Sequence, residues 1–148
     1  MHIRRLRLDH WKAVREIWED CFLAEGFRGT DLGHSWRNRS HQESVGVFDG
    51  DNLLGFAIVS FHKRNKGNRY IDYIAVHSSY RGCGYGNRLM NHLLQKARTA
   101  RRGIHLYPLD HAISWYTKHG FYWSTSDYMN KGPYHHDHLG RSSCPTSL

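Results

Sequence analysis

A glycine-rich loop follows the apolar segment 71–76 and precedes a helical pattern over residues 87–97. Glycine adopts positive φ without strain and lets the backbone approach a ligand closely, so the amides of such a loop can point inward. The apolar spacing after the loop delivers these amides to a helix N-terminus, and Arg81 adds a full positive charge. A phosphate or pyrophosphate suits this arrangement best. A tight turn that binds nothing is the alternative. The three glycines are Gly82, Gly84 and Gly86.

The glycine spacing excludes two common phosphate loops. The loop of nucleotide hydrolases ends in Gly-Lys-Ser or Gly-Lys-Thr, and residues 81–95 contain no lysine. The dinucleotide fingerprint places its third glycine where this chain has Asn87, and it requires an acid about 20 residues further on. The phosphate ligand is therefore of another kind.

The loop resembles the Arg-Gly-x-Gly-x-Gly pyrophosphate loop of the GCN5-related N-acetyltransferases, the GNAT family. As in that family, an aliphatic strand and a short polar turn, His77-Ser78-Ser79-Tyr80, precede it. A second block, Ala-Ile-Ser-Trp-Tyr-Thr-Lys-His-Gly-Phe-Tyr over residues 112–122, resembles the later helix of the family. The resemblance covers residues 53–123.

The resemblance implies an α/β (α+β) fold with one GNAT-like domain. Its sheet is mixed and mostly antiparallel, is flanked by helices, and splays between the fourth strand, residues 69–76, and the fifth, residues 104–107. We expect residues 1–129 to form this domain and residues 130–148 to form a C-terminal tail that is flexible or folds back over the acceptor site. A chain of 148 residues is long enough for one such core.

Hydrophobic periodicity predicts the elements that position the loop. Asp9 is the expected N-cap of the first helix, and Gly120 ends the last one. The expected strands are 3–8, 45–48, 53–61, 69–76, 104–107, 121–123 and 126–129. One helix is expected after Asp9, a second over 31–39, a third from the glycine loop to residue 99, and a fourth over 110–119.

The family likeness implies acetyl-coenzyme A as the cosubstrate. In this fold, unpaired amides near the end of the fourth strand bind the thioester carbonyl and the pantetheine arm, which makes an oxyanion site from backbone alone. The glycine loop holds the pyrophosphate. The residues implied are Ile74, Ala75, Val76, Arg81, Gly82, Cys83, Gly84, Tyr85 and Gly86.

Tyr116 matches the tyrosine of the family's later helix, which implies that it protonates the departing thiolate. A phenol with a pKa of about 10 keeps its proton at neutral pH and still donates it as the sulfur gains charge. The alternative is a packing aromatic beside Trp115, with its hydroxyl at the surface.

The base is less defined, because Tyr70 occupies the position of the glutamate in the histone-acetylating branch. Asp72 lies two residues later on the same face of the strand and is the expected base, acting through water. A carboxylate paired with Arg69, or capping a loop, is the alternative for Asp72. His77 and His105 are further candidates for the base.

The expected activity is N-acetylation of a primary amine by direct attack in a ternary complex. Acids near segment 21–42, the expected wall of the acceptor groove, favour a cationic acceptor such as a polyamine, another small amine or a lysine side chain. They are Glu16, Glu19, Asp20, Glu25 and Asp31.

The net charge of +8 supports a different class of function. A catalytically silent module that binds coenzyme A or nucleic acid would use the same fold and the basic segments at 63–66 and 98–102. Lysine and arginine are also common at helix C-termini and in solvated turns for reasons unrelated to nucleic acid. Nucleic acid is therefore the less favoured partner. A homodimer is left open.

The remaining features favour a cytoplasmic protein with free thiols. The three cysteines have no metal-site spacing and form no even disulfide set. No apolar run reaches the length of a membrane span, and no secretory signal opens the chain. His135-His136-Asp137-His138 has no distant ligand to complete a site, so we expect no metal. A tail that folds back would instead make Tyr134 or His135 functional.

Overall fold

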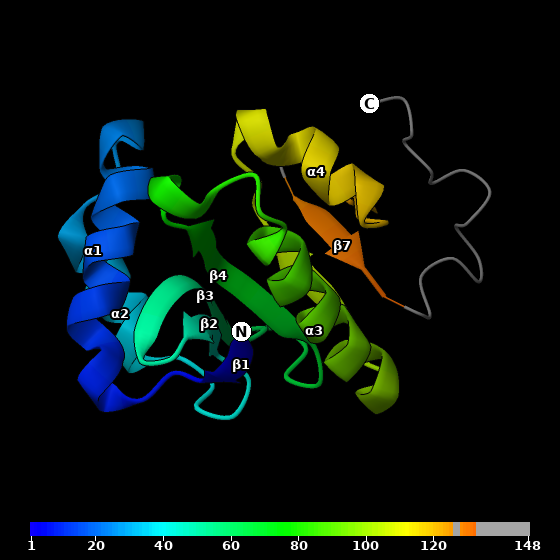
Figure 1. Cartoon of the computed structure of the whole chain (residues 1–148). Coiled ribbons are helices and arrows are strands. Elements are labelled where there is room, and N and C mark those ends of the chain that lie inside the picture. The colour runs from blue at the N-terminus through cyan, green and yellow to red at the C-terminus, as the bar shows by residue number, and fades with distance from the viewer. Residues whose placement is uncertain (126–127, 133–148) are drawn as a thin grey trace. The chain divides into compact units, whose positions relative to one another are not determined.

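The computed structural model describes residues 1–125 and 128–132 (Figure 1). Seven strands form a mixed sheet in the order β1-β2-β3-β4-β5-β7-β6, with a parallel β4–β5 pair among antiparallel pairs. This confirms the α/β fold class. The chain groups into two compact units, residues 1–60 with 71–93, and residues 61–70 with the described residues from 94 onward.

The first unit contains most of four neighbouring strands of the sheet. Strand β1 (His2–Arg5) pairs with β2 (Val45–Asp49), and β2 pairs with β3 (Asn52–Phe61). Strand β4 (Arg69–Val76) follows β3 in the sheet, and its bounds are those that the sequence predicted. The expected β2–β3 hairpin turns at Gly50, which has a φ of 62°.

Seven consecutive residues of β3 are buried, which shows that both faces of this strand are covered. Helices α1 (Trp11–Phe22) and α2 (Gly29–Arg37) lie together in Figure 1. The aromatic rings of Trp18 and Phe22 on α1 pack against Tyr73 of β4. The first half of α3 (Tyr85–Ala100) adds buried Leu89, Met90 and Leu93 to the core.

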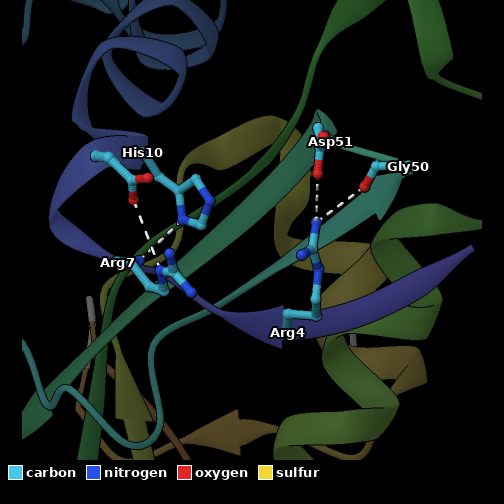
Figure 2. A network of polar contacts seen from close by, with 6 residues as sticks. Arg4, Arg7, His10, Gly50 and Asp51 are labelled. Carbon is cyan, nitrogen blue, oxygen red and sulfur yellow. Dashed lines mark hydrogen bonds and ion pairs between the residues drawn. The ribbon is translucent and has the colours of Figure 1, made fainter.

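The entry into α1 differs from the prediction. Strand β1 ends at Arg5, and a 3₁₀ turn at Leu8–His10 comes before the helix, so Asp9 is not an N-cap. His10 takes the N-cap position of α1, and its ring closes the preceding 3₁₀ turn, where Nδ1 accepts the backbone N–H of Arg7 at 2.9 Å (Figure 2). Imidazole can replace a carboxylate here because its unprotonated nitrogen is an acceptor; consistent with this, burial lowers the pKa of His10.

A second contact in Figure 2 ties β1 to the hairpin turn. Nη2 of Arg4 donates to the carbonyl of Gly50 at 2.8 Å and lies 3.9 Å from Oδ1 of Asp51. Both charged side chains are solvated, so the ion pair itself contributes little, and the charge-assisted bond to the carbonyl holds the turn.

The second unit contains β5 (Ile104–Leu106), β6 (Tyr122–Trp123), β7 (Met129–Lys131) and α4 (Ile113–Lys118). Strand β5 pairs in parallel with the first two residues of β4, in the register Arg69↔Ile104 and Tyr70↔His105. Six further residues of β4 continue beyond this short ladder.

Two expected elements of the second unit have different bounds. The helix expected over 110–119 is a 3₁₀ turn, Asp110–Ala112, followed by α4. The last strand was expected to end at residue 129, but β7 begins there and runs to Lys131, pairing with both β5 and β6. The first two residues assigned to the tail thus belong to the sheet.

Among the described residues, no helix has both the length and the apolar character needed to cross a membrane.

Candidate functional site

The glycine loop has the backbone conformation that its sequence predicted at two of three positions. Gly82 and Gly84 have φ values of 81° and 84°, and a Cβ added at either one would meet no heavy atom within 4 Å. These glycines are therefore required for conformation rather than for space. Gly86 does not adopt positive φ, because α3 already begins at Tyr85 and Gly86 lies in its first turn.

The loop ends at the N-terminus of a long helix. Helix α3 has 16 residues and no acidic residue in its first turn, and its first loop-to-helix bond runs from the N–H of Arg88 to the carbonyl of Gly84. Residues 81–84 are exposed. Exposed amides at the positive end of a helix dipole attract an anion.

The segment between β4 and this loop is held by Asp20 on α1. Its Oδ2 accepts the backbone N–H of Ser78 at 2.8 Å, and its Oδ1 accepts the Ser78 hydroxyl at 3.0 Å. The backbone hydrogen bond is the main reason that the pKa of Asp20 is lowered. Asp20 therefore fixes the start of the turn that leads into the glycine loop.

Arg81 and Cys21 make the next contacts along the same segment. Nε of Arg81 donates to the carbonyl of Val76 at 3.3 Å, and its Nη2 lies 3.1 Å from Sγ of Cys21. The Cys21 thiol donates to the same carbonyl at 3.4 Å, and burial raises the pKa of this thiol. The guanidinium expected beside a phosphate thus joins α1 to the end of β4.

Alternating residues of β4 give the strand two distinct faces. Tyr70, Asp72, Ile74 and Val76 are half-buried, while the residues between them, including Ala75, are buried. On the neighbouring strand a Cβ at Gly55 would come within 2.7 Å of the Ala75 carbonyl, so glycine is needed for this close approach.

Asp72 lies on the half-buried face, as its spacing predicted. Its Oδ1 accepts the hydroxyl of Ser60 on β3 at 2.6 Å. The Arg69 guanidinium, the alternative partner of Asp72, donates to the carbonyls of Lys66 and Asn68 and lies 4.4 Å above the ring of Phe61.

In the second unit, Tyr116 on α4 is buried rather than exposed. Only 8% of the residue is accessible, and its ring packs edge-on against Trp115 and Phe121. Burial raises the pKa of the Tyr116 hydroxyl to about 12. The phenol is therefore protonated at neutral pH, more firmly than the sequence suggested.

The structure weakens the case for either histidine as the base. Nδ1 of His77 accepts the N–H of Ser79 at 3.1 Å, which uses one of its nitrogens. His105 is buried, and both of its ring nitrogens are bonded, to Asn68 and Asn130. Because the Gly103 N–H must donate to Oδ1 of Asn68, the Asn68 amide nitrogen donates to Nε2 of His105 and occupies its lone pair.

Sequence reasoning did not find the roles of Asp20 and Cys21. Each contacts a segment more than 50 residues away in the chain, and no local pattern marks such a pair. Within the described ranges, no three His, Cys, Asp or Glu side chains gather as they would around a metal ion. The His135–His138 cluster, Tyr134 and the rest of the tail from 133 lie outside those ranges.

Together, the loop, the helix N-terminus and the strand end give this α/β protein a backbone arrangement that suits a phosphate-bearing ligand. The sequence profile of the acetyltransferase (GNAT) family matches residues 11–121, which is well over half of the chain. The chain belongs to this family of acetyltransferases, as the glycine loop and the 112–122 block predicted.

Known relatives agree with this assignment. An acetyltransferase of Yersinia pestis (strain Pestoides F) is 25% identical over 96 residues, which are 65% of this chain and 67% of the relative. Ard1 of Thermoplasma volcanium is 23% identical, with a TM-score of 0.71 over 88% of this chain and 96% of that one. A GNAT acetyltransferase of Brucella melitensis, solved with acetyl-CoA, is 20% identical, with a TM-score of 0.67 over 88% of this chain and 86% of that one. The two structures show that the fold is shared.

Proposed function

We propose that this protein transfers the acetyl group of acetyl-coenzyme A to a primary amine. The observation that carries the proposal is the pair of left-handed glycines, Gly82 and Gly84, at the N-terminus of α3. Backbone amides in this conformation suit the pyrophosphate of coenzyme A, and they need no side chain to do so. The B. melitensis relative, which was solved with acetyl-CoA, supports the same ligand.

We assign the two ends of the cosubstrate to different backbone segments. The loop residues Arg81, Gly82, Cys83, Gly84, Tyr85 and Gly86 hold the pyrophosphate. The end of β4, residues 74–76, holds the pantetheine arm and the thioester carbonyl. Arg81 acts partly through its bonds to Val76 and Cys21, which set the position of the loop against the strand. A backbone donor at the carbonyl stabilises the charge that develops in the tetrahedral intermediate.

The transfer proceeds by direct attack of the amine on the thioester. A bond forms between the amine nitrogen and the carbonyl carbon, and the carbon–sulfur bond breaks. Tyr116 gives its proton to the departing thiolate. Its pKa of about 12 keeps that proton in place at neutral pH until the sulfur gains charge.

Asp72 is the proposed acceptor of the amine proton, through water. Deprotonating a free amine of pKa about 10.4 at pH 7 costs roughly 4 to 5 kcal/mol, so the reaction needs such a base. Asp72 is half-buried and shares its face of β4 with Ile74 and Val76. Its hydrogen bond from Ser60 orients the carboxylate.

The acceptor is a small amine, a polyamine or a lysine side chain. Glu16, Glu19 and Glu25 are exposed acids in or near the segment proposed as the wall of the acceptor groove. Asp20 and Asp31 are exposed as well, but each also has a structural role, since Asp20 binds Ser78 and Asp31 accepts the N–H of Arg28 at the start of α2. Three solvated carboxylates favour a cation without selecting its shape.

The test is thiol release from acetyl-coenzyme A in the presence of polyamines, amino sugars and lysine peptides. Wild type should release coenzyme A with at least one of these amines. Tyr116→Phe should lower kcat by about 10² or more with little change in KM for acetyl-coenzyme A. Tyr122→Phe, which removes a hydroxyl from β6, is the matched control. Equal activity in Tyr116→Phe and Tyr122→Phe would contradict the role of Tyr116.

A further inference from the structure

The two units of this protein carry very different charges. The first unit has ten lysine and arginine residues and ten carboxylates, so its formal charge is zero. The second unit, residues 61–70 and 94–148, has eleven lysine and arginine residues and three carboxylates, which gives +8. The basic character of the chain therefore belongs to one unit, and such asymmetry is typical of proteins that bind a polyanion.

Five of these cations gather at one edge of the second unit, which we call the basic edge. Three lie in the turn between β3 and β4, and two lie at the C-terminal end of α3. All five are exposed, and within residues 1–125 and 128–132 none of them is paired with a carboxylate. They are Lys63, Arg64, Lys66, Arg98 and Arg101.

Two hydrogen bonds hold the parts of the basic edge together. The N–H of Arg69 donates to the carbonyl of Gly103, and the N–H of Gly103 donates to Oδ1 of Asn68, both at 2.9 Å. The segment that ends the turn is thus bonded to Gly103, three residues after the end of α3. These bonds join the two segments that carry the basic edge, although they are more than 30 residues apart in the chain.

The turn itself is preorganised. Nδ1 of His62 accepts the N–H groups of Arg64 and Asn65, and Oδ1 of Asn65 accepts the N–H of Gly67. The guanidinium of Arg69 donates to the carbonyl of Lys66. A backbone held by so many local bonds presents its three cations in a defined arrangement, which lowers the entropic cost of binding.

Helix capping does not account for the basic edge. Cations do stabilise a helix C-terminus, which explains one or two residues after Ala97. The three cations of the turn are not at a helix end. Arg101 also has a φ of 55°, and it is the one described residue other than glycine with positive φ, whereas five glycines occupy such positions. The chain keeps a cation where glycine would be less strained.

The basic edge is also distinct from the glycine loop. The loop precedes the first residue of α3, and Arg98 lies in the last turn of the same 16-residue helix. At 1.5 Å per residue the two ends are separated by about 24 Å. The phosphates of one coenzyme A at the glycine loop therefore leave the basic edge unexplained.

We propose that the basic edge is a docking surface for a single-stranded nucleic acid, separate from the acetyl-transfer site. The three arginine and two lysine side chains contact successive phosphates, and guanidinium groups pair with phosphate oxygens in a bidentate manner. Phe61, which is 50% exposed and lies beside Arg69, provides an aromatic surface for one base. An exposed ring among cations favours a single strand over a duplex, whose bases are already stacked.

The test is fluorescence anisotropy of the full chain with a labelled oligouridine strand of about a dozen nucleotides. Five phosphate contacts predict a slope of log K against log salt of about −3.5, so affinity should fall about 100-fold between 50 and 200 mM salt. The variant Lys63→Gln/Arg64→Gln/Lys66→Gln should bind more weakly, with a slope shallower by about 2.

The matched control removes the same charge from the first unit, as Arg5→Gln/Lys12→Gln/Arg15→Gln, and its slope should equal that of wild type. Equal losses in the two triple variants would overturn the proposal, because they would indicate a non-local charge effect. Tighter binding to duplex DNA or to anionic lipid vesicles than to the strand would also overturn it. An oligothymidine strand distinguishes RNA from DNA as the source of the phosphates.

Discussion

The carboxylate of Asp20 on α1 binds both the backbone N–H and the hydroxyl of Ser78, 58 residues away in the chain. The next residue, Cys21, contacts the Val76 carbonyl and the guanidinium of Arg81. Two adjacent residues of one helix thus hold the backbone on both sides of the turn that enters the glycine loop. The geometry of the proposed pyrophosphate site depends on α1 as well as on the loop.

Asp20→Asn should lower the affinity for acetyl-coenzyme A without slowing the chemical step. The amide keeps one acceptor oxygen but loses the charge and one of the two bonds to Ser78, at a cost to folding of about 1 kcal/mol. We expect a higher KM for acetyl-coenzyme A and a nearly unchanged kcat. Asp49→Asn, which removes an exposed carboxylate from β2, is the control. A lower kcat with constant KM would mean that Asp20 acts in the chemistry.

Gly84→Ala should weaken both folding and cosubstrate binding. Its φ of 84° is strained for alanine, although the added methyl group meets no neighbour, so the loss of stability should be about 1 kcal/mol. Calorimetry should show a larger Kd for acetyl-coenzyme A, because the loop amides turn away. Gly29→Ala, where the φ is ordinary and the space is open, should change neither quantity. Unchanged binding by Gly84→Ala would contradict the role of the loop.

Arg101→Gly should stabilise the fold. Glycine relieves the left-handed strain at φ 55°, which should raise the free energy of unfolding in urea by about 0.5 to 1 kcal/mol. The same variant should bind oligouridine more weakly than wild type, with a slope against salt shallower by about 0.7. A gain in stability together with a loss of binding cannot be attributed to misfolding. Unchanged strand binding would remove Arg101 from the docking surface.

Tyr116 should make the protein lose stability in strongly alkaline solution. Its folded pKa of about 12 lies above the unfolded value of about 10, so the unfolded chain releases this proton first. The stabilisation is complete below pH 10 and is lost as the pH rises through 12, by roughly 2 to 3 kcal/mol. Urea titrations of wild type and Tyr116→Phe at several pH values test this. Parallel pH profiles would show that the hydroxyl is not buried in solution.

The local features of the fold could be predicted from the sequence. The bounds of β4 follow from its apolar run, and the β2–β3 hairpin follows from Asp49-Gly50-Asp51-Asn52. The glycine loop could be assigned a ligand class because alternate glycines before a helix have a specific backbone use. In each case the pattern that predicts the element lies within a few consecutive residues, and the backbone preferences of those residues determine the local structure.

Long-range contacts could not be predicted in this way. Asp9 has the residue type of an N-cap, but a 3₁₀ turn closed by the bond between His10 and Arg7 shifts the start of the helix past it. Asp20 was one of the acids assigned to an acceptor amine, and its bond to Ser78 could not be foreseen from the sequence. The burial of Tyr116 depends on packing with Phe121, which periodicity in a six-residue helix does not reveal. Tertiary contacts decide these roles, and one sequence does not show them.

The most direct test of the central claim is thermal unfolding with acetyl-coenzyme A, compared with ATP and NAD at equal concentration. A ligand at about 100 times its Kd adds roughly 2.7 kcal/mol of stability, which raises the Tm of a chain of this size by several degrees. We expect that shift with acetyl-coenzyme A, a much smaller one with ATP or NAD, and its loss in Gly84→Ala. An absent shift with acetyl-coenzyme A, or an equal shift with ATP, would contradict the assignment of the glycine loop.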